Sequence, residues 1–248
     1  MKNNRFFSIN TLSILTALAF ALSLFSCDRE NKDNTENLVI EEAEVVEVME
    51  GALKTSSDGM AEDMEEAVYL AQEYEEKSGG NPCGESFDST VVYNVANSYI
   101  TAAYTSNWGW TVICNDFNVP SEIDFTRASA GTYETTRMLS DDSSNGNWNI
   151  SNLILGDAYV FNGVYTRQGS QESKVNEQRA FSSLLSIEVD SINIDKGNQE
   201  ILSGIASFTL TATGPEGATS TFEGDIVFNG GGSVTLIING NSYNIDLF

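Results

Sequence analysis

The stretch VTLIINGNSYNIDL, residues 234–247, decides the fold class of this chain. Apolar residues occupy every second position from Val234 to Ile238, which is the alternation of a strand with one buried face. Asn239 and Gly240 follow, and a two-residue Asn-Gly loop forms a type I′ turn whose twist matches the flanking strands. The stretch therefore predicts an antiparallel hairpin at the C-terminal end of the chain.

The same pattern extends N-terminally to about residue 81. Gly230, Gly231 and Gly232 predict the preceding turn, and Thr, Val, Ile, Tyr, Phe, Ser, Asn and Gly dominate, with turn residues every eight to twelve positions. Short connections between consecutive strands favour a meander, so residues 81–248 are predicted to form one antiparallel, mostly β domain. A sandwich, a curved sheet or a partly closed barrel would all fit. The predicted strands are 87–96, 99–105, 108–115, 121–128, 131–139, 147–154, 158–168, 181–195, 200–213, 218–229, 232–239 and 241–247.

Residues 38–80 are predicted to be an acidic helical leader. Ser57 or Asp58 can cap a helix over 59–77, whose apolar residues recur at three and four positions. Residues 38–53 mix β-branched residues with good helix formers, and we favour a helix there. Whether the leader packs on the β domain stays open. The apolar stripe of the second helix consists of Met60, Met64, Ala67, Val68, Ala71 and Tyr74.

The first residues have the pattern of a secretory signal. Lys2 and Arg5 precede an apolar run over 12–25, which is too short to span a bilayer comfortably. Residues 1–26 are therefore predicted to be a signal peptide that is removed, and residues 27–37 a disordered acidic tether. No other stretch of the sequence is apolar enough to span a membrane.

The segment Leu24-Phe25-Ser26-Cys27 resembles the lipobox of bacterial lipoproteins, although Phe25 is bulkier than the residue usual there. The resemblance implies that Cys27 is acylated and anchors the chain in the cell envelope, at the outer membrane. The acids after Cys27 resemble the tether that sends many lipoproteins of Bacteroidota-type bacteria to the cell surface. The alternative is a plain signal peptide or anchor helix, in which Cys27 is incidental.

The layout as a whole resembles small uncharacterised envelope lipoproteins of Bacteroidota-type bacteria. The segments that carry the resemblance are GTYET at 131–135, SDDS at 140–143 and FNGVYT at 161–166. The resemblance implies a related fold and no known activity.

Cysteine usage agrees with export. With Cys27 acylated, Cys83 and Cys114 remain as a pair, and an oxidising envelope permits a disulfide between them. Two buried free thiols are the alternative.

The charge excludes one class of partner. The chain has 36 acids and 12 bases, a net charge of −24. Nucleic-acid binding requires Lys or Arg at each phosphate contact, so no nucleic-acid partner is expected. Anionic lipid surfaces would repel the domain, whereas cations or basic partners would be attracted.

The absence of histidine excludes Ser-His-Asp and Cys-His catalysis and histidine-based metal sites. A glycoside hydrolase would need two acids about 5–10 Å apart across a cleft. Asp141 with Asp142, or Asp124 with Glu134, could be proposed for that role. Solvated surface charges are the alternative reading of these acids.

The polar stretch 141–147 is a candidate calcium loop, because calcium takes six to eight oxygen ligands. Asp141, Asp142 and Asn145 would supply oxygens around a glycine turn. An ordinary polar turn has the same composition. No other cofactor is expected.

Trp108 and Trp110 are two residues apart, so in a strand they share a face. Exposed, they could stack on sugar rings; buried, they would fill the core. The sequence thus favours a non-enzymatic interaction or structural protein of the envelope, with glycan binding as the alternative and a carboxylate glycoside hydrolase third.

Overall fold

The computed structural model describes residues 39–77, 83–175 and 179–248, with the backbone alone for 73–77. Residues 38–248 cluster as one compact unit. The predicted signal peptide, the tether and Cys27 lie outside the described residues. Among the residues that are described, no helix has both the length and the apolar character needed to cross a bilayer.

Two helices precede the sheet, as predicted. Helix α2 spans Glu42–Leu53, the 3₁₀ turn η1 spans Thr55–Ser57, and helix α3 spans Met60–Lys77. A capping box between Glu41 and Glu44 begins α2. The predicted stripe of α3 is buried from Met60 to Ala71, whereas the side chain of Tyr74 lies outside the description.

Ten strands follow and pair only with their sequence neighbours, in the order β1 to β10. All the pairings are antiparallel, which confirms the predicted meander. Of the arrangements that the sequence left open, the structure adopts a single curved sheet that is not closed. The strands are β1 Ser86–Ala96, β2 Ile100–Cys114, β3 Pro120–Thr135, β4 Met138–Ser151, β5 Ala158–Ser173, β6 Ala180–Asp195, β7 Ile201–Thr213, β8 Thr219–Gly230, β9 Ser233–Ile238 and β10 Asn241–Asp246.

Several predicted strand boundaries were wrong, because three long strands contain turn-like residues. The predicted strands 99–105 and 108–115 form the single strand β2, and 121–128 joins most of 131–139 in β3. The polar stretch 141–147 lies inside β4 and is not a loop. Each of these segments is hydrogen-bonded on both sides by neighbouring strands, and such pairing overrides the local preference for a turn.

The C-terminal hairpin matches its prediction. Asn239 and Gly240 connect β9 to β10 and both have positive φ, 51° and 84°, as a type I′ turn requires. The glycines of the preceding turn also have positive φ, from Gly230 to Gly232.

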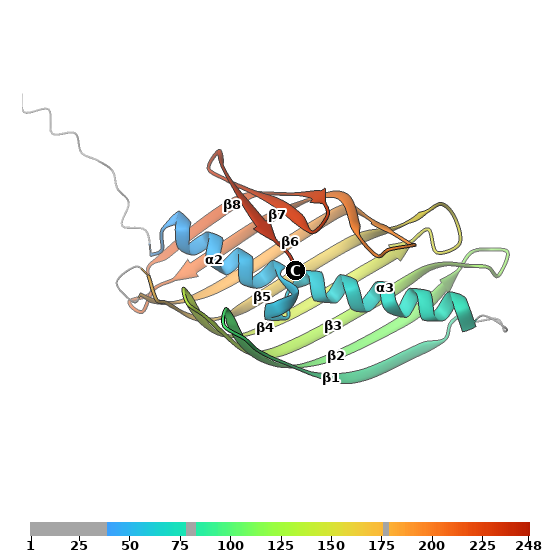
Figure 1. Cartoon of the computed structure of the whole chain (residues 1–248), viewed down its shortest axis with the longest axis horizontal. Coiled ribbons are helices and arrows are strands. Elements are labelled where there is room, and N and C mark those ends of the chain that lie inside the picture. The colour runs from blue at the N-terminus through green and yellow to red at the C-terminus, as the bar shows by residue number, and fades with distance from the viewer. Residues whose placement is uncertain (1–38, 78–82, 176–178) are drawn as a thin grey trace, which may run out of the picture. The chain divides into compact units, whose positions relative to one another are not determined.

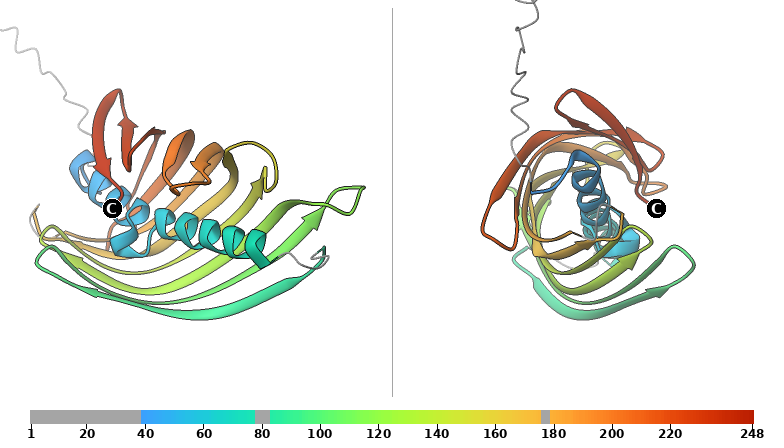
Figure 2. Two further views of the ribbon diagram at one scale, coloured as in Figure 1. Left: turned by 45° about the vertical axis from the view of Figure 1, so that its right-hand side comes forward. Right: turned by 90° about the vertical axis from the view of Figure 1, so that its left-hand side faces the viewer.

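The sheet curls around the helices, and α2 and α3 run lengthwise along its concave face (Figures 1 and 2). The views in Figure 2 also show an opening along one side, between the first and last strands. One continuous apolar core joins the helices to the concave face, with Met49, Leu53 and Met64 on the helices and Phe125 and Phe161 on the sheet. The leader is therefore part of the β fold, and its packing was not predictable from the sequence.

Candidate functional site

A layer of buried charge joins the helices to the middle of the sheet. Arg127 of β3 donates from Nη2 to Asp58 at 2.6 Å and from Nη1 to Asp63 at 2.9 Å. Ser129 also donates to Asp58, and the indole of Trp148 donates to Asp63 at 3.1 Å. Arg127 thus ties the segment between the helices and the first turn of α3 to the sheet.

A second buried cluster surrounds Arg167 of β5. Its guanidinium donates to the carbonyl oxygens of Gly51 and Ser57 at 2.5 and 3.0 Å, and it forms an ion pair with Asp142 at 2.9 Å. The rings of Tyr104 and Tyr133 lie 5.5 and 5.3 Å from the guanidinium carbon. This cluster fixes the C-terminal end of α2.

Protonation in these clusters follows from burial and charge. Burial raises the pKa of Asp63 to about 6, although Arg127 acts in the opposite direction. Burial alone would lower the pKa of Arg127, but Asp63 and Asp58 hold it above its ordinary value. Both arginines therefore remain charged and bonded to their partners, so the layer holds the helices on the sheet.

In contrast to these buried clusters, strand β1 at one edge of the sheet is exposed. It pairs with β2 on one side only, and its residues from Ser86 to Val92 are exposed on both faces of the strand. Its single charge is Asp88, and it contains no proline, lysine or bulge of the kinds that protect edge strands. Strand β1 thus presents an open template for backbone pairing.

The opposite edge of the sheet, strand β10, contacts the leader. Thr55 donates from its backbone to the carbonyl oxygen of Leu247 at 3.0 Å. Tyr243 and Asn241 of β10 both donate to the carboxylate of Glu42 on α2. The two edges therefore differ: β10 is six residues long and contacts the leader, whereas β1 is eleven residues long and offers the longer open edge.

The backbone of β1 shows which groups point away from the sheet. Asn97 donates to Ile100 at one end of the β1–β2 pair, and Val112 donates to Glu85 at the other. Because hydrogen-bonded pairs alternate along an antiparallel ladder, the odd-numbered residues between them bond to β2. The N–H and C=O groups of the even-numbered residues 88 to 94 consequently point outward.

Trp108 and Trp110 share the concave face of β2, as predicted. Trp110 is 8% exposed and lies under Phe87 of β1, with ring centroids 5.0 Å apart. Trp108 is half-buried beside Phe125, and its indole N–H is buried without an acceptor among the described residues. Phe87 is 52% exposed and so forms the accessible surface of this aromatic row.

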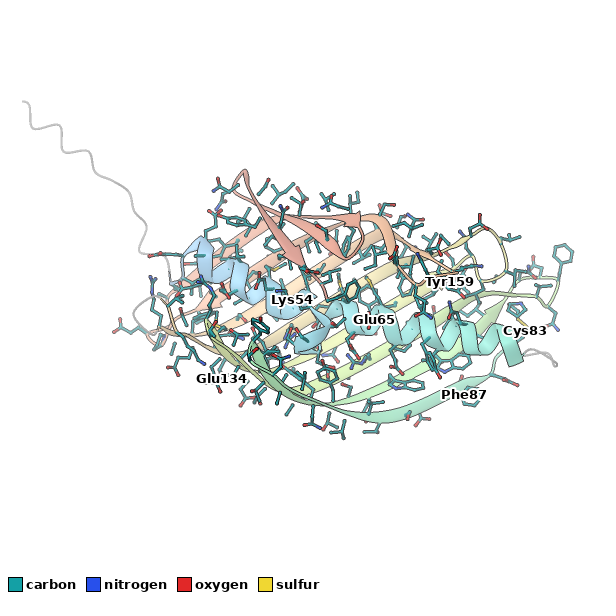
Figure 3. All side chains as sticks on the ribbon, viewed as in Figure 1. Lys54, Glu65, Cys83, Phe87, Glu134 and Tyr159 are labelled. Carbon is teal, nitrogen blue, oxygen red and sulfur yellow. A yellow bond between two sulfur atoms is a disulfide. The ribbon has the colours of Figure 1, made fainter. Side chains whose placement is uncertain are left out.

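Acids of α3 face the concave side of β1. Burial raises the pKa of Tyr93, and Glu62, Asp58 and Glu65 raise it further, so their negative field reaches this strand. Burial also raises the pKa of Glu62 to about 7. The side chain of Glu62 forms no hydrogen bond or ion pair with any residue that the structure describes, and the nearby Arg127 is bonded to Asp58 and Asp63. Figure 3 labels Glu65 on α3 and Phe87 on β1.

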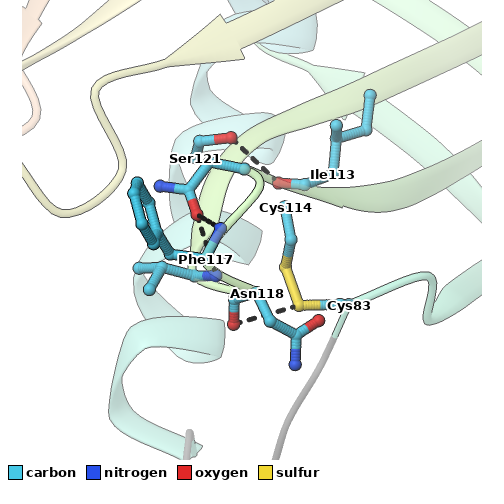
Figure 4. The surroundings of a disulfide bond; sticks show 8 residues. Cys83, Ile113, Cys114, Phe117, Asn118 and Ser121 are labelled. Carbon is cyan, nitrogen blue, oxygen red and sulfur yellow. Dashed lines mark hydrogen bonds between the residues drawn. A yellow bond between two sulfur atoms is a disulfide. The ribbon is translucent and has the colours of Figure 1, made fainter.

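A disulfide joins Cys83 to Cys114, as predicted, with a Cα–Cα distance of 5.5 Å. It holds the chain at the start of β1 to the end of β2 (Figure 4). The side-chain oxygen of Asn115 accepts from the backbone of Phe117 and Val119, which orders the adjoining loop. The disulfide thus anchors the N-terminal end of the edge strand β1.

The predicted acid and metal sites do not assemble. Asp142 points toward Arg167, whereas Asp141 and Asn145 lie on the opposite, convex face of β4. Asp124 and Glu134 are ten residues apart on β3, about 33 Å at the rise of a strand. The described residues contain no group of three or more Cys, Asp or Glu side chains that could hold a metal ion. Both hypotheses assumed a loop or a cleft, whereas these residues lie along the continuous strands β3 and β4.

Phe87 and Glu62 were not singled out from the sequence. Phe87 lies in a predicted strand, but nothing local shows that this strand is at an edge. Glu62 lies in an acidic turn that reads as a solvated helix start. Comparison of the chain with family models, curated proteins and solved structures finds no match.

Proposed function

We propose that this chain is an envelope-anchored, non-enzymatic interaction protein whose contact surface is the β1 edge. The observation that carries the proposal is the length and exposure of that edge: its 11 residues are unpaired on one side, and those from Ser86 to Val92 are exposed on both faces. Natural sheets protect such edges unless a partner covers them. Addition of a strand to an open edge is a common mode of peptide recognition.

Photo-crosslinking in whole cells tests this proposal. A benzophenone side chain at Asn94, which is exposed and whose backbone groups point outward, should form an adduct with a partner. The same group at Leu184, which is 54% exposed on an interior strand, should not. The adduct at Asn94 should disappear in Val92→Pro, because proline removes an outward N–H and leaves the β1–β2 ladder intact. Equal adducts at both positions, or none at Asn94, would contradict the proposal.

The anchor is part of the same proposal and is tested separately. Cys27→Ser should abolish incorporation of labelled fatty acid and move the protein from the membrane fraction to the soluble fraction. Cys83→Ser is the matched control, because it removes a cysteine that is not in the lipobox. Unchanged labelling of Cys27→Ser would exclude acylation at this residue.

A second proposal is glycan binding by the aromatic row. The stacked Phe87–Trp110 pair, with Phe87 half exposed, supports it, since aromatic faces of this kind can pack against sugar rings. Titration of oligosaccharides against tryptophan fluorescence should then give a signal that Phe87→Ala abolishes. Signals that persist in Phe87→Ala and disappear in Trp108→Ala would assign the sugar to the half-buried tryptophan.

A further inference from the structure

We infer that the partner segment recognised at β1 is cationic: an extended peptide with Lys or Arg at alternate positions, which adds to β1 as an eleventh strand. This inference rests on the proposed function and names the chemistry of the partner.

The backbone provides the first half of the site. The even-numbered residues of β1 from 88 to 94 point their N–H and C=O groups away from the sheet. An incoming strand can therefore form a regular ladder with them. The side chains of such a strand would alternate between the two faces, as in every β-strand. One row of side chains would continue the concave face beside Val91 and Tyr93, and the other row would face solvent with Val92.

The helix provides the second half. Glu62, Glu65 and Tyr69 are three and four residues apart on α3, so they form one stripe on the helix surface. Helix α3 lies over the β1–β3 side of the concave face (Figures 1 and 2), where Asp63 pairs with Arg127 of β3. The effect of Glu62 and Glu65 on the pKa of Tyr93 agrees with a stripe on the β1 side. Side chains in the concave row of an added strand would therefore meet carboxylates.

Within the described residues, no lysine or arginine side chain is available to pair with Glu62 and Glu65. Each lysine and arginine whose side chain the structure describes already has a partner. The buried arginines bind Asp58, Asp63 and Asp142. The remaining bases are occupied at the surface: Lys54 by Glu50, Arg137 by Glu47, Lys174 by Glu134, Arg179 by Glu41, and Lys196 by backbone carbonyl oxygens.

Charge also distinguishes the occupant from a second copy of the chain. Two copies paired through β1 would bring two acidic stripes together, and each copy carries a net charge of −24. A cationic segment instead gains from the desolvated carboxylate of Glu62 and from the aromatic rings of Tyr93 and Phe87.

Peptide binding to residues 28–248, which contain the whole compact unit, tests the inference. The probe is a peptide of about nine residues that alternates lysine with threonine, a residue with strong strand preference. Its controls alternate glutamate with threonine, or lysine with glycine at the same charge. We expect the lysine–threonine peptide to bind at least about tenfold more tightly than either control, and its affinity to fall with added salt.

Three variants locate the binding. Val92→Pro should abolish it, whereas Val92→Thr should preserve it because the backbone donor remains. Glu62→Gln combined with Glu65→Gln should weaken it about tenfold. Glu188→Gln combined with Glu223→Gln, two exposed acids far from β1, removes the same charge and should leave the affinity unchanged.

The outcomes separate this inference from the proposed function. If lysine and glutamate peptides bind equally well and Val92→Pro abolishes the binding of both, the edge binds strands and the inference of a cationic partner is wrong. If binding persists in Val92→Pro, or if no strand peptide binds, both proposals are overturned. A concentration-dependent dimer that Val92→Pro abolishes would assign the edge to a second copy of the chain.

Discussion

Single residues on the concave face decide how closely the helices approach the sheet. At Gly146 of β4 a Cβ atom would overlap the carboxylate of Asp63 and the indole nitrogen of Trp148, which bond to each other. Gly146→Ala should therefore lower the free energy of unfolding by about 2–4 kcal/mol through overpacking and loss of that bond. Urea denaturation measures this change.

Gly109→Ala on β2 is the matched control, because a Cβ there meets nothing closer than 3.4 Å. It should change stability by less than about 1 kcal/mol. Equal losses in the two variants would show that the clash at Gly146 is relieved by movement of the helix.

Glu62 links stability to pH. Its pKa in the folded protein is about 7, against an ordinary value of 4.5, so the folded state binds its proton more tightly than the unfolded state does. The contribution of Glu62 to stability is therefore full below about pH 4.5 and is lost as the pH rises through 7. Glu62→Gln should raise the free energy of unfolding by about 1–3 kcal/mol at about pH 8 and have little effect at about pH 4.

Denaturation curves across this pH range measure the effect, with Glu223→Gln on the convex face as control. A stabilisation by Glu62→Gln that is the same at both pH values would show that its charge is not desolvated.

At the scale of elements, β1 is held by one neighbouring strand and has little burial. The Cys83–Cys114 bridge closes a loop with a sequence separation of 31, which is worth about 3–4 kcal/mol in the chain-entropy model. Replacing both cysteines by serine should lower stability by about this amount. Hydrogen exchange should also accelerate in β1 more than in β5, which is paired on both sides. Equal acceleration in both strands would mean that the bridge acts on global unfolding alone.

At the scale of the whole molecule, the leader supplies the second layer of the fold. A curved sheet with a largely apolar concave face requires a cover, and α2 and α3 provide it with residues that include Val45, Met49, Leu53, Met60 and Met64. Residues 83–248 alone should therefore aggregate or bind a hydrophobic dye. Residues 39–248 should unfold in one cooperative transition. A soluble 83–248 fragment with a sharp thermal transition would contradict this view.

The sequence by itself determined the features that rest on local chemistry. Asn239-Gly240 specified its hairpin because both residues accept positive φ, and the alternation around it specified a sheet with one buried face. The helical stripe predicted α3 and its buried face. The pairing of Cys83 with Cys114 followed from the cysteine count once Cys27 was set aside as a lipid anchor, and that anchoring remains a prediction.

Only the tertiary structure decided which polar residues are buried and which strand is open. The stretch SDDSSNGN at 140–147 reads as a turn, yet it is the middle of β4, because two neighbouring strands and Arg167 satisfy its polar groups. Nothing local distinguishes β1 from an interior strand, and its role as an edge depends on where the sheet begins and on which strands pair with it. Such features arise from contacts between residues far apart in the chain, which local propensity does not contain.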